Sequence, residues 1–565
     1  MAGENHGKLN YYLYQTVSVK ESFRGFAING GNVNDYSGTS VSTAGDVNGD
    51  GLDDLIVSAR RADPSGKINA GESYVIFGKT DNTAINLSAI ASGTGGFVIN
   101  GENTNDFSGY SVSTAGDVNG DGLDDLIVGA FYADPSGKKD AGRSYVIFGK
   151  TDNTAINLPA IGTGGFVING ENADDESGTS VSTAGDVNGD GLDDLIVSAR
   201  RADPSGKLSA GKSYVIFGKT DNTAINLSAI ASGTGGFIIN GENTNDFSSW
   251  SVSTAGDVNG DGLDDLIVGA PFAGSSGKFS TGKSYVVFGK ADNTAINLSA
   301  IASGTGGFVI IGENAGDLSG VLVSTAGDVN GDGLDDLIVG ALDATPSGKA
   351  NAGKSYVIFG KTDTDAINLT NLGGNSKYAI DYLGDKNANT FTGTSSDEIF
   401  VAGAGDDTLI GNGGMDVLNA GAGNDTIAIN ASNIVALAQT GTGNRARVDG
   451  GGNTDTLKLD GSDLTLNLTN ISNTRIQDIE KINITGSGSN TLILNLNDVL
   501  DTSTSTNILK VLGNSDDTVN ASGFVKALGA ETEGSITYDV YTHSVANTDA
   551  KAALWIQQDV GSVIL

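Results

Sequence analysis

Short apolar segments separated by polar turns fill the first two thirds of the chain. Each segment is rich in Val, Ile, Leu, Tyr and Phe, as in DLIV, SYVIF and GFVI, and Gly, Asn, Asp or Ser follows it. β-branched and aromatic runs bounded by turn residues are typical of β-strands. No run of about 18 apolar residues, the length that a membrane-spanning helix needs, occurs anywhere. The pattern predicts an all-β protein.

The strand pattern is repeated. The segment DVNGDGLDDLIV starts at Asp46, Asp117, Asp186, Asp257 and Asp328. Around it, each unit contains GF-x-I-NG, SVSTAGDV, DLIV and SYVIFGK, which we interpret as four short strands with the GF segment first. A four-stranded unit repeated radially is the pattern of a β-propeller, whereas a linear β-solenoid has shorter repeats. We therefore predict a propeller with five visible blades over residues 23–384.

Additional β-like segments lie on both sides of the five units. Residues 11–19 (YYLYQTVSV) precede the first unit, and KYAIDYLG, from Lys377, resembles a sixth copy of the opening strand. Surplus strands can close the ring within one chain or add to the open edge of a neighbouring subunit. We favour closure within one chain and keep self-association as the alternative.

Composition excludes several classes of function. The chain has 68 acidic and 32 basic residues, a formal net charge of −36, which repels nucleic acid and anionic membrane surfaces and suits multivalent cations. It has no cysteine, so disulfides and thiolate metal sites are excluded. Its 84 glycines fit a protein with many tight turns.

The repeated loop D-x-N-G-D-G-x-D-D has the chemistry of a calcium site. Oxygen-bearing side chains occupy positions 1, 3, 5 and 9, glycine at position 6 allows a sharp turn, and position 7 offers its backbone carbonyl. Without a cation, the acidic side chains of one loop would repel one another. The predicted ligands are Asp46, Asn48, Asp50, Leu52 and Asp54; Asp117, Asn119, Asp121, Leu123 and Asp125; Asp186, Asn188, Asp190, Leu192 and Asp194; Asp257, Asn259, Asp261, Leu263 and Asp265; and Asp328, Asn330, Asp332, Leu334 and Asp336.

These units resemble the FG-GAP repeats of integrin α-subunit propellers, because the loop, the strand after it and the period all match. In that family the calcium loops lie in a hairpin of each blade. Propellers of this kind commonly have seven blades, and only five metal-bearing units are visible here. The resemblance implies about five calcium ions in the blades.

A second repeat begins at Gly393, where the period falls to nine residues: GTSSDEIFV, AGAGDDTLI, GNGGMDVLN, AGAGNDTIA. It resembles the RTX, or hemolysin-type, calcium-binding nonapeptide of parallel β-rolls. The resemblance implies that Asp407, Asp416 and Asp425 bind calcium between turns. The first copy departs from the motif at Ser396 and Glu398, so we expect about two ions here. A later fragment, 450–459, is interpreted as a stray turn.

The remaining chain divides into an N-terminal extension with a β-strand (1–22), the β-roll (385–430) and a C-terminal β-rich domain (431–565). The last region resembles the tails of RTX proteins exported by type I secretion, with an apolar end at Val563, Ile564 and Leu565. This implies a secreted protein at a bacterial cell surface.

The sequence favours a calcium-binding structural or adhesion protein, such as an S-layer, matrix or filament subunit. A module that binds glycans or proteins through the propeller loops is the alternative. We predict no enzyme, because the chain has only two histidines, His6 and His543, both near its ends. A glycosidase or lyase that uses only carboxylates is the least favoured alternative.

Overall fold

The computed structural model describes residues 25–275, 277–373, 378–503, 507–543 and 553–565. The N-terminal extension predicted over 1–22, including the strand at 11–19, lies outside these residues. None of the helices that the model describes is long and apolar enough to span a bilayer.

Four blades are antiparallel sheets of four strands. Their strands, in chain order, are β2 (Val41–Gly45), β3 (Asp54–Ala59), β4 (Glu72–Ile76) and β6 (Gly96–Asn100) in blade 1; β7 (Ser111–Gly116), β8 (Asp125–Ala130), β9 (Arg143–Ile147) and β11 (Gly165–Asn169) in blade 2; β12 (Ser177–Gly185), β13 (Asp194–Ala199), β14 (Lys212–Ile216) and β16 (Gly236–Asn240) in blade 3; and β17 (Ser251–Gly256), β18 (Asp265–Ala270), β19 (Lys283–Val287) and β21 (Gly307–Ile311) in blade 4. Blade 5 has three strands: β22 (Ser319–Gly327), β23 (Asp336–Ala341) and β24 (Lys354–Ile358).

A fifth strand of two residues joins each complete blade from the following repeat, parallel to the fourth strand. These strands are β10 (Ile156–Asn157), β15 (Ile225–Asn226), β20 (Ile296–Asn297) and β25 (Ile367–Asn368), and β5 (Ile85–Asn86) pairs in the same way with β1 (Ile28–Asn29). Single helical turns follow three of them: α1 (Leu87–Ala91), α2 (Leu227–Ala231) and α3 (Leu298–Ile301).

The GF segment belongs to a different blade from the one that we assigned to it. In β6, Phe97 lies opposite Val75 of β4, so the segment forms the fourth strand of the preceding blade. The same pairing recurs through blade 4. A repeated string can be divided into units at any point, and the antiparallel pairing of consecutive strands determines where one blade ends.

Apolar side chains fill the space between neighbouring blades. Ile196 and Val215 of blade 3 are fully buried against Val252 and Val268 of blade 4. The equivalent residues of blade 5, Ile338 and Val357, are 40% and 44% exposed. Blade 5 therefore presents an uncovered apolar face.

The end of blade 5 is also open at its sheet edge. The expected sixth opening strand is wrong: β26 (Tyr382–Asp385) pairs in parallel with β28 of the C-terminal part and leaves β24 as an edge strand. At the other end, β1 pairs only with β5 within the described residues. Closure of the ring within one chain is therefore not found in the part of the chain that the structure describes.

The C-terminal part winds into coils with parallel sheets on their faces. One sheet contains β26, β28 (Ile399–Gly403), β30 (Val417–Asn419), β32 (Arg447–Asp449) and β35 (Ile476–Gln477). A second contains β27 (Thr390–Thr392), β29 (Thr408–Ile410), β31 (Thr426–Ile429), β33 (Thr456–Leu459), β36 (Lys481–Asn483), β38 (Ile508–Leu512), β42 (Ala553–Gln557), β41 (Ile536–His543) and β40 (Phe524–Glu533). A third contains β34 (Thr465–Asn467), β37 (Thr491–Leu494), β39 (Thr518–Ala521) and β43 (Ser562–Ile564), and the longer helices are α4 (Ala431–Leu437) and α5 (Leu496–Thr502).

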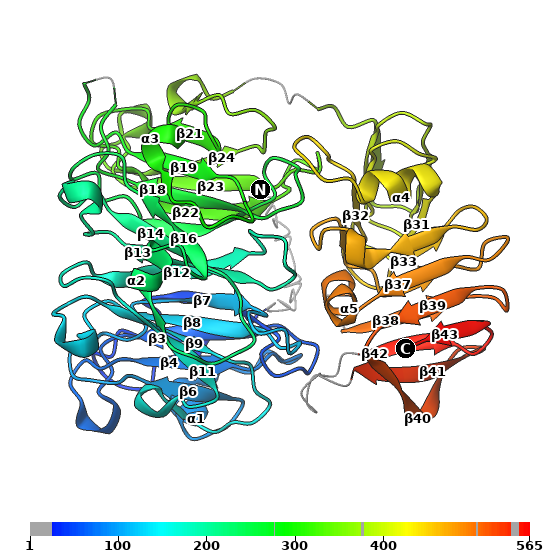
Figure 1. Cartoon of the computed structure of the whole chain (residues 1–565), viewed down its shortest axis with the longest axis horizontal. Helices are drawn as coiled ribbons and strands as arrows, with labels where there is room; N and C mark the ends of the chain where they lie inside the picture. The colour runs from blue at the N-terminus through cyan, green and yellow to red at the C-terminus, as the bar shows by residue number, and fades with distance from the viewer. Residues whose placement is uncertain (1–24, 276, 374–377, 504–506, 544–552) are drawn as a thin grey trace, which may run out of the picture.

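This C-terminal part lies beside the blades and runs back along them, from α4 near blade 4 to β40 near the level of blade 1 (Figure 1). Its interior is one apolar core that includes Phe400, Leu409, Leu418 and Ile427, the apolar residues of the four nonapeptides. The all-β class, the five blades and the strand-rich parallel sheets after them are confirmed.

Candidate calcium sites

Each acidic loop connects the first and second strands of its blade. In the first loop, Asp46 accepts hydrogen bonds from the N–H groups of Asp50 (3.0 Å) and Gly51 (2.8 Å). Asp50 in turn accepts from the N–H of Leu52 at 3.0 Å. Gly51 has a φ of 85°, a left-handed conformation that glycine adopts without strain. The carboxylates of positions 1 and 5 thus hold the loop in a tight turn.

The carboxylate at position 9 is buried beneath this turn. Asp54 is fully buried and accepts from the N–H of Gly78 (2.7 Å) and from Nδ2 of Asn48 (3.2 Å). Burial, and then the charges of Asp46 and Asp50, raise the pKa of Asp54 to about 7. The same causes raise the pKa of Asp194 to about 9 and that of Asp336 to about 7. Burial and the neighbouring carboxylates thus disfavour the ionised form of this residue, and a bound cation would relieve both effects.

The fourth loop contains an oxygen that lacks a partner. Asn259 is fully buried, and its Nδ2 donates to Asp265 at 3.1 Å, but its Oδ1 has no hydrogen-bond partner. A buried oxygen without a donor is costly, and calcium is a cation that binds carboxylate, amide and carbonyl oxygens. In the described part of the chain, no three acidic or histidine side chains gather as a metal cluster. Each loop would therefore complete the calcium shell with asparagine, backbone carbonyl and water oxygens.

Position 8 of the loop has a role that the sequence analysis missed. Asp124 of blade 2 accepts the N–H of Asp46 in blade 1 at 2.8 Å. The same bond, at 2.9 Å, joins Asp193 to Asp117, Asp264 to Asp186 and Asp335 to Asp257. This carboxylate therefore connects each loop to the loop of the preceding blade. The recurrence of an aspartate at position 8 of every loop was the signal in the sequence that could have indicated this role.

The β-roll aspartates form a second series of sites. The carboxylate of Asp407 accepts a hydrogen bond from the backbone N–H of Asn389 at 2.5 Å. The carboxylate of Asp425 accepts one from the N–H of Asp407 at 2.6 Å, and the carboxylate of Asp455 accepts one from the N–H of Asp425 at 2.7 Å. In all three, the second carboxylate oxygen is buried without a hydrogen-bond partner. These oxygens fit a cation held between coils. Asp455, in the segment we interpreted as a stray turn, belongs to this series.

Asp416 lies apart from that series. One carboxylate oxygen of Asp416 accepts a hydrogen bond from the backbone N–H of Glu398 at 3.0 Å, and the other accepts one from Nδ2 of Asn433 at 2.8 Å. The structure thus brings Asp407 and Asp425 together with Asp455 and places Asp416 in a separate, fully hydrogen-bonded position.

The C-terminal part packs directly against the calcium loops. Asn419 donates to the carbonyl of Gly331 in the fifth loop (3.5 Å), Ser472 to that of Gly262 in the fourth (2.7 Å) and Asn497 to that of Gly191 in the third (2.7 Å). Asn507 donates to Asp46 in the first loop at 3.1 Å. Coils later in the chain therefore contact loops earlier in the chain, and the contacts reach the fifth, fourth, third and first loops.

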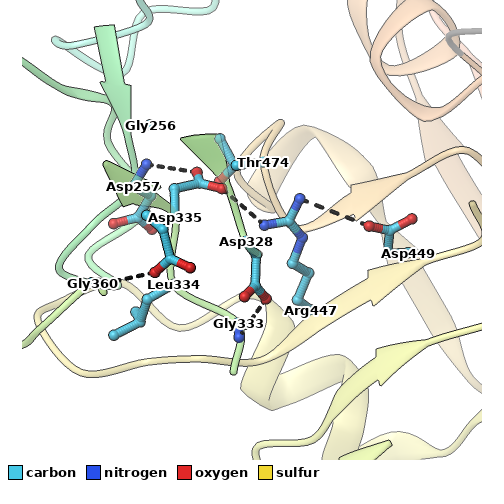
Figure 2. Close-up of polar contacts among 12 residues, drawn as sticks. Gly256, Asp257, Asp328, Gly333, Leu334, Asp335, Gly360, Arg447, Asp449 and Thr474 are labelled. Carbon is cyan, nitrogen blue, oxygen red and sulfur yellow. Dashed lines mark hydrogen bonds and ion pairs between the residues drawn. The ribbon is translucent and has the colours of Figure 1, made fainter. Parts of the chain in front are cut away.

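Three arginines place positive charge at the fourth and fifth loops, and the first, Arg445, donates to the carbonyl of Asp332 at 3.0 Å. Arg447 donates to Asp335 at 3.3 Å and lies between Asp335 and Asp449 (Figure 2). Arg475, which is 4% exposed, donates to the carbonyl of Gly260 at 3.3 Å and lies 3.7 Å from Asp257. A cavity of about 350 Å³ remains between the other loops and the coils, lined by Asp46, Asp53, Asp117, Asp124, Asp186, Asp193, Asp264, Asp501 and neutral residues.

Comparison with known families identifies both repeats. The FG-GAP repeat model matches residues 37–76, 108–147, 177–216, 249–287 and 320–358, and the model of the RTX calcium-binding nonapeptide repeat matches residues 392–427. The chain therefore carries five FG-GAP repeats and an RTX calcium-binding repeat.

Several known proteins are similar in sequence to part of this chain. Integrin alpha pat-2 of Caenorhabditis elegans is 31% identical over 264 residues, 46% of this chain and 20% of that protein. Integrin alpha-PS2 of Drosophila melanogaster is 34% identical over 194 residues, 33% of this chain and 12% of that protein. Phosphatidylinositol-glycan-specific phospholipase D of Bos taurus is 31% identical over 184 residues, 30% of this chain and 20% of that protein. The chain thus spans a fifth or less of the length of these relatives.

Proposed function

We propose that this chain, a calcium-binding protein with FG-GAP and RTX repeats, is an extracellular adhesion or structural protein of a bacterial cell surface that calcium folds and stiffens. The observation that carries the proposal is the contact between coils and loops, in which Asn419, Ser472, Asn497 and Asn507 all reach loop groups. Calcium that orders the loops would therefore also order the surface on which the C-terminal part packs.

The energy of calcium binding supports folding outside the cell. Extracellular calcium modules bind with constants of about 0.1–1 mM. At a free calcium concentration tenfold above that constant, each site stabilises the fold by about 1.4 kcal/mol, while the total stability of a domain is about 5–15 kcal/mol. In the cytosol this contribution is absent and the buried carboxylates oppose folding. The chain would then be exported unfolded, which fits the type I secretion resemblance of residues 431–565.

The test is thermal unfolding followed by circular dichroism in millimolar calcium and in chelator, with magnesium as a control for ionic strength. We expect a large loss of melting temperature in chelator that magnesium does not restore. An unchanged melting temperature would contradict the proposal. Calorimetric titration would count the ions, for which we propose about five in the blades and about two in the β-roll.

The role that we propose is not enzymatic. The relatives include a phospholipase D as well as integrins, but that match covers only a fifth of the enzyme. His543, the one histidine among the described residues, packs edge-on against Phe524 at 5.1 Å, and its partial burial lowers its pKa. The blade carboxylates are engaged in loop and inter-blade hydrogen bonds, which leaves them poorly placed for acid–base catalysis.

The open end of blade 5 favours the structural form of this function. Val357 and Phe359 are 44% and 47% exposed, and β24 is an edge strand. Exposed apolar surface beside an unpaired strand edge is a typical site of association. We propose that copies of the chain associate through this end. Sedimentation in calcium should show oligomers, and Val357→Asp should convert them to monomers with the same melting temperature.

A binding module is the second candidate. The loops after the second strand of each blade lie at the end opposite the calcium loops, and they differ between blades: ARRADPSGK follows β3 and APFAGSSGK follows β18. Variable loops on a common scaffold are the usual location of ligand contacts. Binding to immobilised glycans and to surface proteins would separate this candidate from a purely structural role.

A further inference from the structure

Two identical arginine pairs lie at the blade ends that face away from the calcium loops. Arg60 and Arg61 follow β3 in blade 1, and Arg200 and Arg201 follow β13 in blade 3. The loops that contain them have the same sequence, SARRADPSGK. In a chain of net charge −36, paired arginines on one surface are exceptional, and the two copies allow a direct comparison.

In blade 3 a carboxylate neutralises the pair. Glu176 accepts from Nε of Arg200 (3.0 Å) and from its terminal nitrogen (2.8 Å), and its other oxygen lies 2.9 Å from Nε of Arg201. Both nitrogens of Arg200 donate to one carboxylate oxygen, and hydrogen bonds between ionised groups of this kind are stronger than neutral ones. Glu176 is only 4% exposed and contacts both arginines, so an internal carboxylate already neutralises part of the charge of this pair.

In blade 1 the carboxylate is missing. Tyr36 occupies the position of Glu176 with nearly the same backbone, a φ of 56° against 54°. Arg61 lies over the Tyr36 ring at 4.7 Å and Arg60 over the Tyr110 ring at 5.3 Å. Nε of Arg60 is buried with no hydrogen-bond partner, and no acidic residue in the described part of the chain forms an ion pair with either arginine.

Aromatic rings continue the surface from these arginines into blade 2. Tyr110 lies 4.4 Å from Phe131, and Phe131 lies 4.0 Å from Tyr132, between ring centres. Tyr36 is 54% exposed and Tyr132 is 36% exposed. Exposed rings of this kind offer flat apolar surfaces with a hydroxyl group at the edge.

We propose that the blade 1 pair, Arg60 and Arg61, binds an acidic sugar whose carboxylate takes the place that Glu176 occupies in blade 3. The sugar ring would pack on Tyr36, which is 54% exposed beside Arg61. A single acidic sugar supplies both a carboxylate and an adjacent apolar face, which matches an arginine pair beside exposed rings. The net charge of the chain disfavours polyanions, so the ligand is a glycan with an isolated acidic unit.

The inference rests on the binding-module form of the proposed function and is independent of calcium-driven folding. The probe is sialyllactose, with lactose as its neutral counterpart, measured by calorimetry or saturation-transfer NMR on the full chain in millimolar calcium. We expect saturable binding of sialyllactose at least tenfold stronger than that of lactose. Arg60→Ala with Arg61→Ala should reduce the affinity at least tenfold.

The sharpest variant is Tyr36→Glu, which introduces the blade 3 carboxylate into blade 1 and should abolish binding. Its matched control is Leu318→Glu, at the same position of blade 5, where no arginine pair follows β23; this variant adds the same charge and should keep the affinity. Melting temperatures of all variants in calcium show whether they fold, which separates this proposal from the calcium proposal.

Three results would overturn the inference. These are equal binding of sialyllactose and lactose, unchanged affinity in the folded Tyr36→Glu variant, and tighter binding of a short glutamate-containing peptide than of the sugar. The last result would instead assign the pair to an acidic protein partner.

Discussion

Asp54→Asn should stabilise the fold strongly without calcium and less in its presence. Asp54 is fully buried, and burial together with Asp46 and Asp50 raises its pKa to about 7. Above that pH, the folded protein without calcium must hold this carboxylate ionised beside two others. Asparagine removes the charge and keeps an oxygen that can accept from Gly78 and Asn48, so it relieves the repulsion but weakens the calcium site.

The size of the effect follows from the pKa. The rise from 3.8 to about 7 corresponds, at about 1.36 kcal/mol for each unit, to roughly 4 kcal/mol of unfavourable free energy at pH 8. A change of 1 kcal/mol shifts the melting temperature of a domain of 150–250 residues by about 2–4 °C, so without calcium the variant should melt roughly 10 °C higher. At a free calcium concentration tenfold above the dissociation constant, the wild type regains about 1.4 kcal/mol at this site, which offsets part of the difference.

The assay is the melting temperature across a series of free calcium concentrations at pH 8. The wild-type curve should rise more steeply than that of Asp54→Asn, so that the difference between the two melting temperatures narrows as calcium is added. Asp53→Asn is the control, because Asp53 is exposed and, among the described residues, makes no inter-blade hydrogen bond like that of Asp124. Curves that stay parallel, or a variant that melts lower at every concentration, would show that Asp54 is a neutral structural group and would refute the reasoning.

Three further predictions concern pH, the β-roll and the interface. Without calcium, the melting temperature should rise as pH falls from 9 to 5, since Asp194 and Asp336, with pKa values raised to about 9 and about 7, gain protons when folded while unfolded aspartates remain ionised to about pH 4. In calcium the slope should flatten, because the bound ion keeps these carboxylates ionised in the folded protein as well, and fluorimetric melting in both solutions checks it. Asp425→Asn should remove one calcium ion in a calorimetric titration, and an unchanged stoichiometry would exclude it as a ligand. Arg475→Ala should lower the free energy of unfolding by about 3–5 kcal/mol in urea unfolding, because it leaves the buried Asp257 without its cationic partner. A loss below about 1 kcal/mol would show that water screens this ion pair.

Local features of this protein could be predicted from its sequence because they depend on neighbouring residues. The loop turn is encoded within nine residues, since Asp46 bonds the N–H groups of Asp50 and Gly51. The strands are short apolar runs with their own turns. The division into blades was not predictable in this way. The GF strand could pair with the strand before it or with the strand after it, and the pairing of Phe97 with Val75 shows that it pairs with the strand before it.

Contacts between distant repeats left weaker signals. Asp124 bonds Asp46 across 78 residues, and only the recurrence of a second aspartate in each loop hinted at such a role. The packing of Ser472 on Gly262, across 210 residues, has no periodic pattern to reveal it. Long-range contacts of this kind appear only when the two parts of the chain are placed together.

The basic residues of the coils lie at some calcium loops and not at others, so the blades should differ in how strongly their stability depends on calcium. Burial raises the pKa of Asp257 and that of Asp328, and the charges of Arg475 and Arg447 oppose this rise, so the coils supply protein cations to the fourth and fifth loops. Opposite the first three loops, the coil residues that line the cavity are Asn473, Thr474, Gln477, Asn497, Leu500, Asp501 and Asn507, none of them basic. Because cations from solution must neutralise those loops, blades 1–3 should lose their order first as calcium is withdrawn. The last coils, which contact these blades through Asn497 and Asn507, should separate with them, while the arginine-bearing coils remain attached to blades 4 and 5.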